Sequence, residues 1–165
     1  MTKSAEDILR DEWDLLKKSG LLTSISCSAG PKRLGRKSYD MLHWNALMRA
    51  PKNSPYSGYM FKFEIDFTEN YPNSRPVVKC KDKIYHMNIR ESDGDVCVSS
   101  IKDSDDWKKA QDISTVLLSI FIIFSKPNPD SPYRGSIATL YNNNREEYIK
   151  KVKEECAKYA TKIPE

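Results

Sequence analysis

The stretch FKFEIDF, residues 61–67, decides how the rest of the chain is interpreted, because its pattern is so regular. Its apolar side chains alternate strictly with charged ones. The apolar residues are Phe61, Phe63, Ile65 and Phe67. Successive side chains of a β-strand point to opposite faces, so this alternation predicts a half-buried strand of an antiparallel sheet. The apolar side of that strand must be covered by other elements of the chain.

Shorter segments on both sides of this strand are also typical of strands. They are LLTSISCS at 21–28, MLHWNALM at 41–48 and VVKC at 77–80. A basic, glycine-containing loop around Gly35 separates the first two. With residues 61–67 these segments predict a four-stranded antiparallel meander.

An amphipathic helix is predicted ahead of the strands. Ser4 followed by Asp7 resembles a capping box, the arrangement that satisfies the first backbone N–H groups of a helix. The apolar residues Leu9, Trp13 and Leu16 then recur at helical spacing. Gly20 is a plausible end of this helix, because glycine readily adopts the left-handed conformation that closes one.

The remaining helices are predicted after residue 112. ISTVLLSIFIIF at 113–124, capped by Asp112, is apolar on nearly all sides and is expected to be a buried helix against the sheet. Three prolines follow within KPNPDSP, and a short helix is expected near 137–142. A long helix should start at Arg145, with Asn144 as its N-cap and Glu147 completing a capping box. Its expected apolar face is Tyr148, Ile149, Val152, Cys156 and Tyr159.

These elements predict an α+β fold: one helix, a meander sheet, a long loop and then helices. The 165 residues suit a single domain spanning residues 1–165. No apolar signal segment follows the first residue, and the longest apolar run, residues 115–124, is shorter than the roughly 20 residues of a bilayer span. We therefore expect a cytoplasmic or nuclear protein that does not enter a membrane.

The charge and the cysteines exclude two classes of site. Net charge is +4, with basic residues gathered at 32–37 and 149–162. Neither stretch interleaves aromatic residues with base-reading groups, so we interpret them as solvated faces and expect no nucleic acid partner. The four cysteines form no CxxC pair, which argues against a zinc site. They are Cys27, Cys80, Cys97 and Cys156.

Residues 81–112 show no periodicity and are predicted to be one long loop, a feature that is often functional. This loop contains Cys97, for which two interpretations stand. Cys97 is either a small buried residue between Val96 and Val98, or a reactive thiol near the surface. The acidic residues around it would raise a thiol pKa, which argues against a resting thiolate. A Cys–His hydrolase would need a histidine base, and the chain offers only two histidines for that task.

Several motifs in one order give the chain its resemblance to a known family. They are CSAGP at 27–31, APKNSPYSGYMF at 50–61, YP and RP within 71–76, IYHMNI at 84–89, GDVCVSSI at 94–101, Trp107, and PNPDSP at 127–132. In this order and spacing the chain resembles the ubiquitin-conjugating enzymes from about Ser4 to Ala160. The fold of that family is a four-stranded meander with an N-terminal helix and with helices after the active-site loop, which agrees with the pattern above.

The resemblance implies a mechanism. In the family, the cysteine at the position of Cys97 accepts the C-terminal carboxyl group of ubiquitin, or of a ubiquitin-like protein, from an activating enzyme as a thioester. A lysine amine then attacks the thioester. Asn88 matches the residue that stabilises the oxyanion or, in a competing view, orders the loop. Tyr85 and His86 are then structural residues around the site. No cofactor or metal is expected in this chain, since ATP and magnesium would belong to the activating enzyme.

The attacking lysine needs assistance, because a reference pKa near 10.4 leaves only about one group in 10³ neutral at pH 7. The family places an acidic or hydroxyl side chain near the cysteine, at the position held here by Ser131, with Asp130 beside it. Serine can orient an amine but carries no charge unless it is phosphorylated. The acidic residues at 91–95 and 103–106 either draw a cationic lysine or are solvated loop.

The chain also departs from the family pattern. Met87 stands where proline is usual, which leaves the turn before Asn88 looser. The first helix is acidic where the family is basic. The two loops that usually meet RING-type ligases contain Asn73 and, in the second, Lys109 and Ala110. Ser28 matches a non-covalent ubiquitin site or is a plain strand residue.

Two functions therefore compete. The first is an active conjugating enzyme that works with a modifier, an activating enzyme and a RING- or HECT-type ligase. The second is a catalytically weak or inactive relative that binds ubiquitin or scaffolds a partner. The presence of Cys97 favours the first. The other cysteines of the chain are assigned no chemistry.

Overall fold

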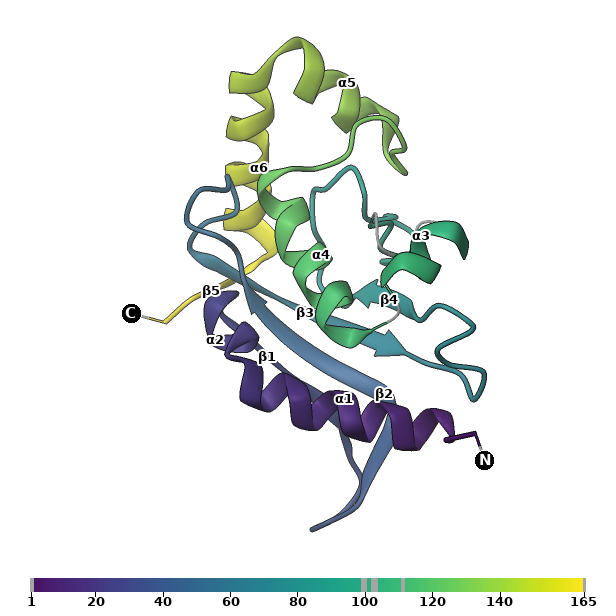
Figure 1. Ribbon diagram of the computed structural model, residues 1–165. Coiled ribbons are helices and arrows are strands. Elements are labelled where there is room, and N and C mark those ends of the chain that lie inside the picture. Colours follow the sequence, from purple (N-terminus) through teal and green to yellow (C-terminus); the bar gives the residue numbers. More distant parts are fainter. Residues whose placement is uncertain (1, 99–100, 102–103, 111, 165) are drawn as a thin grey trace.

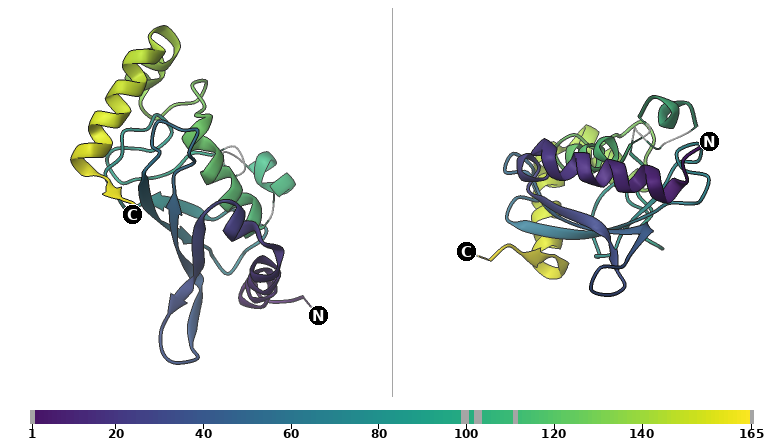
Figure 2. Two further views of the ribbon diagram at one scale, coloured as in Figure 1. Left: turned by 90° about the vertical axis from the view of Figure 1, so that its left-hand side faces the viewer. Right: turned by 60° about the horizontal axis from the view of Figure 1, so that its bottom comes forward.

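The computed structural model describes residues 2–98, 101, 104–110 and 112–164 of the chain. Figure 1 shows a twisted antiparallel sheet with helices α1 and α4 packed on it, and the views in Figure 2 show both helices on the same side of that sheet. The hairpin that joins β1 to β2 projects away from the helices (Figure 2). This arrangement confirms the predicted α+β fold.

The sheet has the predicted meander order β1–β2–β3–β4, with antiparallel neighbours. Its strands are β1 Cys27–Arg33, β2 Tyr39–Arg49, β3 Tyr59–Asp66 and β4 Val77–Cys80. A fifth strand that the sequence pattern did not predict, β5 Thr161–Lys162, pairs with the start of β3 at Tyr59 and Met60. Two residues are too few to show any alternation of side chains.

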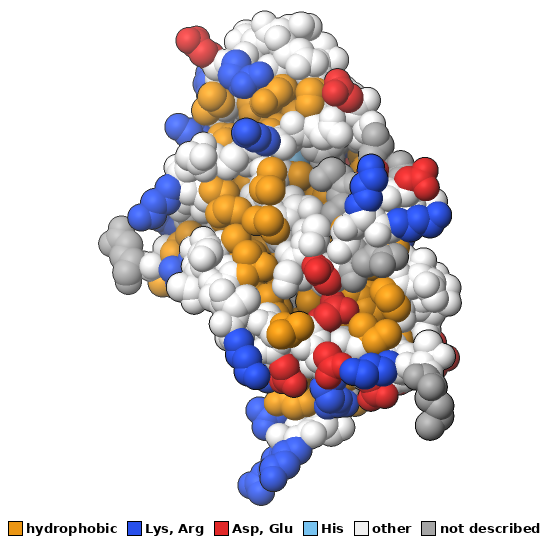
Figure 3. All heavy atoms as spheres, in the orientation of Figure 1, with side chains coloured by type: hydrophobic (Ala, Val, Ile, Leu, Met, Phe, Trp, Pro, Cys, Tyr) orange, Lys and Arg blue, Asp and Glu red, His pale blue; other side chains and the backbone are white. Residues whose placement is uncertain are grey.

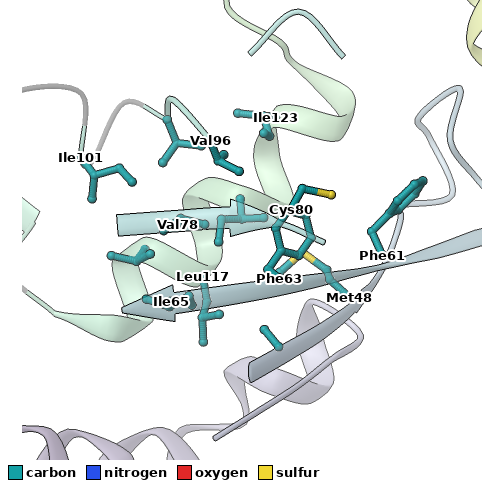
Figure 4. Close-up of a cluster of buried hydrophobic side chains, with 14 of the residues drawn as sticks. Met48, Phe61, Phe63, Ile65, Val78, Cys80, Val96, Ile101, Leu117 and Ile123 are labelled. Carbon is teal, nitrogen blue, oxygen red and sulfur yellow. The ribbon is translucent and has the colours of Figure 1, made fainter. Parts of the chain in front are cut away.

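The alternation in residues 61–67 appears in the structure as predicted. Its four apolar side chains are buried, whereas Lys62 is exposed and Glu64 and Asp66 are partly exposed. Figure 4 shows Phe63 and Ile65 among buried side chains from β2, β4 and α4. The core therefore lies between the sheet and the helices on its inner side.

The first helix, α1 Ala5–Ser19, has the predicted ends. The Ser4 hydroxyl oxygen accepts a hydrogen bond from the Asp7 N–H at 3.1 Å, and Gly20 has φ 79°. Leu9 and Leu16 are buried, and the partly buried Trp13 ring meets the Trp44 ring edge to face.

The prediction of a strand over 21–28 is wrong for its first half. Residues Leu21–Ser24 form a short helix, α2, and the strand begins only at Cys27. The Ser24 N–H and side-chain hydroxyl both donate to the Gly20 carbonyl. Gly20 therefore ends one helix and also begins another, an outcome that the apolar run alone does not indicate.

The later helices are α4 Ile113–Ser125, α5 Gly135–Asn143 and α6 Arg145–Tyr159. Asp112 and Asn144 cap α4 and α6 as predicted, accepting from Thr115 N at 2.7 Å and from Glu147 N at 3.2 Å. The expectation that Tyr159 belongs to the buried face of α6 is wrong. Its side chain is exposed, and the Lys83 ammonium lies 4.0 Å from its ring centre.

Helix α4 is buried on the side that meets the sheet but not all round. Its outward residues Leu118 and Ile122 are 40% and 45% exposed. Figure 3 shows hydrophobic side chains gathered along the middle of this face of the molecule. None of the helices in the described ranges is long and apolar enough to cross a membrane.

The prediction of one structureless loop over 81–112 is also wrong in part. Residues Ser104–Ala110 form helix α3, whose Trp107 is buried and donates from Nε1 to the Pro72 carbonyl at 2.6 Å. Two apolar residues, Trp107 and Ala110, in a seven-residue helix are too few to give a clear periodicity. The predicted acidic residue Asp103 lies outside the described residues, whereas Asp105 and Asp106 are in α3.

Candidate active site

Cys97 lies in a short extended segment that pairs with the loop before it. The Cys97 N–H donates to the Asn88 carbonyl at 2.9 Å, and Ile89 and Val96 form an isolated antiparallel bridge. Val96 and Val98 are buried, whereas Cys97 between them is partly exposed. The valines therefore fill the core, and the sulfur is not sealed inside it.

A small cavity of about 100 Å³ lies beside Cys97. Its lining includes Asp95, Cys97 and Tyr133, and also Arg75, whose Nη1 donates to the Ile101 carbonyl at 2.6 Å. Charged groups of both signs therefore border the space next to the thiol.

Asn88 connects the loop before Cys97 to the segment after α4. Its side chain is buried, its Oδ1 accepts from the Asn128 N–H at 2.8 Å, and its Nδ2 donates to the Asn128 carbonyl at 2.9 Å. The amide nitrogen carries two hydrogens, and this bond uses one of them. The structure thus brings Asn88 beside Cys97 through the backbone and fixes its side chain on Asn128.

His86 is fully buried and stands two residues before Asn88 in the same loop. Its Nε2 donates to the Ile123 carbonyl at 2.8 Å, and its Nδ1 accepts from the Asn88 N–H at 3.0 Å, which requires the neutral ring. Burial lowers the pKa of His86 to about 4. The ring is also stacked on Tyr56, whose hydroxyl donates to the Tyr85 carbonyl.

Neither histidine of the chain is placed as a base for Cys97. Both ring nitrogens of His86 have backbone partners, and His43 is exposed on β2 with its Nδ1 2.8 Å from Asp40 Oδ2. The Cys–His hydrolase interpretation therefore lacks its base.

The predicted lysine-orienting residues lie in the turn after α4. Asp130 is exposed and its N–H donates to the Asn128 side-chain oxygen at 3.0 Å, while Ser131 is partly exposed. Neither Asp130 nor Ser131 lines the cavity beside Cys97. Asn128 thus connects this turn to Asn88.

Tyr133 was not predicted to be a site residue, and Asp95 was considered only as one of the acidic residues at 91–95. Both border the same cavity as Cys97. The Tyr133 hydroxyl donates to Asp95 Oδ2, and the Tyr133 N–H donates to the Met87 carbonyl at 2.8 Å. One signal was present in the sequence for Asp95. It stands two residues before Cys97, with the buried Val96 between them, which places Asp95 and Cys97 on the same side of an extended segment.

The structure brings the two predicted ligase loops side by side. Trp107 of α3 bonds to Pro72, the residue before Asn73, which is exposed. In α3, Lys109 is exposed and Ala110 is partly buried. A contact between segments 35 residues apart therefore makes one surface of them.

Ser28 is exposed on β1, opposite Leu47 of β2, and borders a groove of about 610 Å³. Lys62, the exposed residue of β3 that pairs with Leu47, borders the same groove. Ser28 therefore lies on the outer face of the sheet. Among the described residues, no group of three or more His, Cys, Asp or Glu side chains could hold a metal ion.

Comparison with known proteins agrees with this architecture. Residues 9–156 match the family described as "Ubiquitin-conjugating enzyme". The chain is also 38% identical over 113 residues to "Ubiquitin-conjugating enzyme E2 3" of Arabidopsis thaliana, an alignment that covers 68% of this chain and 73% of that protein.

Proposed function

Because the chain belongs to the ubiquitin-conjugating enzyme family, we propose that Cys97 accepts ubiquitin or a ubiquitin-like modifier as a thioester. The modifier then passes to a lysine amine, directly or with a ligase. The observation that carries this proposal is the placement of Cys97: its neighbours Val96 and Val98 are buried, while its own side chain borders a surface cavity.

The proposed reaction has two acyl transfers. In the first, the Cys97 sulfur attacks the modifier's C-terminal carbonyl carbon, which the activating enzyme holds as a thioester, and the activating enzyme's sulfur leaves. In the second, a lysine nitrogen attacks the same carbon, the bond to Cys97 breaks and an amide forms. The lysine ammonium loses one proton to water before the attack. The nitrogen then loses a second proton, which goes to the departing Cys97 sulfur and restores the thiol.

Asn88 has two roles in this proposal. Its two bonds to Asn128 hold the loops on either side of the site together. The second hydrogen on Nδ2 is then a donor for the charge that develops on the thioester oxygen. A single aimed donor of this kind can contribute about 2.7–4 kcal/mol.

The lysine-orienting role proposed for Ser131, with Asp130 beside it, rests on their positions in the turn that Asn128 anchors. Because Ser131 carries no charge, it can orient an amine only by hydrogen bonding. Equal lysine-transfer rates for Ser131→Ala, Ser131→Asp and the unmodified protein would exclude both Ser131 and its phosphorylation from the reaction.

Partners in general follow from the family, whose members act with ubiquitin, an activating enzyme and ligases. We further propose that RING- or HECT-type ligases meet the surface around Asn73, Lys109 and Ala110, which the Trp107 bond to Pro72 holds together. Ser28 is proposed as part of a non-covalent ubiquitin contact on the outer face of the sheet. The proposed location is the cytoplasm or the nucleus.

A second function is favoured by one observation. Both polar ends of the Asn88 amide are hydrogen-bonded to Asn128, so its catalytic use depends on the remaining hydrogen. A catalytically weak protein that binds ubiquitin or scaffolds a partner would fit the same structure.

Thioester loading separates the two functions. The protein is incubated with an activating enzyme, ATP, magnesium and a panel of modifiers, and the products are run with and without a reducing agent. An adduct that the reducing agent removes, that Cys97→Ala lacks and that Cys97→Ser replaces with a stable oxyester supports the enzyme. The matched control is Cys27→Ser, because burial raises the pKa of Cys27 to about 12 and it should take no part. No adduct with any modifier, together with measurable ubiquitin binding, would support the scaffold.

A further inference from the structure

An acidic side chain lies next to the candidate nucleophile and is held there by a tyrosine. Asp95 and Cys97 border the same small cavity, and the Tyr133 hydroxyl donates to Asp95 Oδ2. Tyr133 is itself fixed through its backbone, because its N–H donates to the carbonyl of the buried Met87 at 2.8 Å. Both ends of this contact therefore have a defined position.

Charged groups of both signs surround Asp95. Arg90 also lies near Tyr133, but its guanidinium makes two bonds to Asp93, at 2.9 and 2.7 Å. Asp93 Oδ1 in turn accepts the Asp95 N–H at 3.1 Å, which fixes the backbone of Asp95. The other cation at the cavity, Arg75, donates to the Ile101 carbonyl at 2.6 Å. The tyrosine hydroxyl engages one carboxylate oxygen of Asp95, and a carboxylate has two acceptor atoms.

We propose that the Asp95 carboxylate, held by the Tyr133 hydroxyl, draws the cationic ε-ammonium group of the acceptor lysine to the Cys97 thioester and so favours lysine over uncharged nucleophiles. This inference rests on the proposed thioester function and specifies how that site selects its acceptor. Asp95 attracts and orients the lysine before it loses its proton to water, and the acyl transfer then proceeds as above. Opposite charges a few ångströms apart at a protein surface attract each other appreciably even in the presence of solvent.

Asp95 suits this role better than the residues that follow α4. Asp130 is exposed and Ser131 is neutral, and neither borders the cavity at Cys97. Asp95 is charged, borders that cavity and is only two residues from the sulfur. The acidic group therefore comes from the extended segment that carries Cys97, not from the turn after α4.

The test compares two nucleophiles on the preformed thioester. Purified Cys97–ubiquitin thioester is mixed with Nα-acetyl-lysine amide, whose only charge is the ε-ammonium, or with hydroxylamine, which is uncharged near neutral pH. Asp95→Asn should slow discharge to the lysine compound about five- to tenfold and leave discharge to hydroxylamine unchanged. Added salt should slow lysine discharge in the unmodified protein and have little effect in D95N.

Three further variants complete the test. Glu91→Gln removes the same charge from a nearby loop position outside the cavity and should discharge both nucleophiles at the unmodified rate. Asp95→Glu should keep most of the preference for lysine. Tyr133→Phe keeps the Asp95 charge but removes the hydrogen bond to it. Discharge to the lysine compound should therefore fall, by less than in D95N, while discharge to hydroxylamine stays unchanged. If D95N does not form a thioester, this variant tests the proposal in its place.

Two results would overturn the inference while leaving the proposed function intact. One is a D95N thioester that reacts with the lysine compound at the unmodified rate. The other is equal slowing with both nucleophiles, which would show a structural role. Failure of the unmodified protein to form any thioester would instead refute the proposed function itself.

Discussion

The side chain of Asn88 makes both its hydrogen bonds to the backbone of one residue, Asn128, from within the protein. This contact joins segments 40 residues apart and places Pro127 to Ser131 next to the Cys97 loop. The Asn88 amide therefore helps to preorganise the site, together with the Tyr133 N–H bond to the Met87 carbonyl.

Removing that amide should lower stability as well as activity. Asn88→Ala loses two buried bonds and leaves the Asn128 N–H and carbonyl without partners, so the free energy of unfolding should fall by about 2 kcal/mol. Urea unfolding measures this. Asn128→Ala is the matched control, because it keeps the backbone groups that Asn88 uses. Equal stability of the Asn88→Ala variant and the unmodified protein would show that this tie contributes little.

The buried His86 predicts a pH dependence of stability. Its pKa is lowered to about 4 from 6.5, because burial disfavours the charged ring. Between these two pH values the unfolded state binds more protons than the folded state does. The contribution of His86 to the free energy of unfolding is therefore complete above about pH 6.5. It is lost as the pH falls toward about 4, by about 3 kcal/mol in all. Urea unfolding at several pH values measures the slope. His43→Gln should keep the slope and His86→Gln should lose much of it; the opposite pattern would assign it to another group.

At the scale of the elements, capped helices and alternating strands were predictable because their signals are local. β3, the ends of α1 and the caps of α4 and α6 all depend on residues within four positions of each other. The errors arose in segments too short to carry a pattern. Residues 21–24 form a single turn of helix that starts at Gly20, and α3 forms around Trp107, whose partner Pro72 lies 35 residues earlier in the chain.

The same division applies to the site. Cys97 and Asn88 could be named from motifs, and their pairing follows from a short loop. Asp95 and Tyr133 could not be paired from the sequence, because they are 38 residues apart and meet only when the segment after α4 folds back. The resemblance to a family likewise gives no information on side chains that depart from its pattern.

Alanine substitutions at Gly94, in the turn before Cys97, and at Gly58 should differ sharply in their cost to stability. Gly94 has φ 79°, and a Cβ added there would lie 2.1 Å from the Cys80 carbonyl oxygen. Gly58 has φ 97° but no neighbouring atom within 4 Å of an added Cβ. Gly58→Ala should therefore cost about 1 kcal/mol for its backbone conformation alone.

Gly94→Ala should cost at least about 2 kcal/mol more, because backbone atoms must move apart. Both costs are measured as free energies of unfolding in urea. Similar values for the two variants would mean that the turn at Gly94 shifts easily, and that the position of the Cys97 segment is less firmly set than the contacts indicate.

At the scale of the whole molecule, Glu12 connects three parts of the fold. From α1 its carboxylate accepts from the Tyr71 hydroxyl at 2.7 Å and from the Ile113 N–H at 2.9 Å. Burial raises the pKa of Glu12, because it disfavours the charged carboxylate. The two hydrogen bonds act in the opposite direction and stabilise the charged form. The first helix, the loop before β4 and the start of α4 therefore meet at one side chain.

Glu12→Ala should lower the free energy of unfolding by about 2–3 kcal/mol, because two partly buried donors lose their acceptor. Thermal and urea unfolding provide the measurement. Asp14→Ala is the matched control: it removes an exposed carboxylate of the same helix, which lies 3.4 Å from Lys17 Nζ, and it should change little. Comparable losses in both variants would argue against Glu12 as a connecting residue.

The extended segment that carries Cys97 also limits how the loop ahead of it can vary in length. Val96 and Val98 occupy the interior, and the sulfur between them faces outward. Side chains of this segment therefore alternate between the interior and the surface, and a shift by one residue exchanges the two sets. One residue inserted between Gly94 and Cys97 would turn the sulfur inward and present a valine to the modifier, whereas two inserted residues would restore it. Related chains should therefore tolerate length changes before the turn, while the spacing from turn to sulfur can change only in even steps.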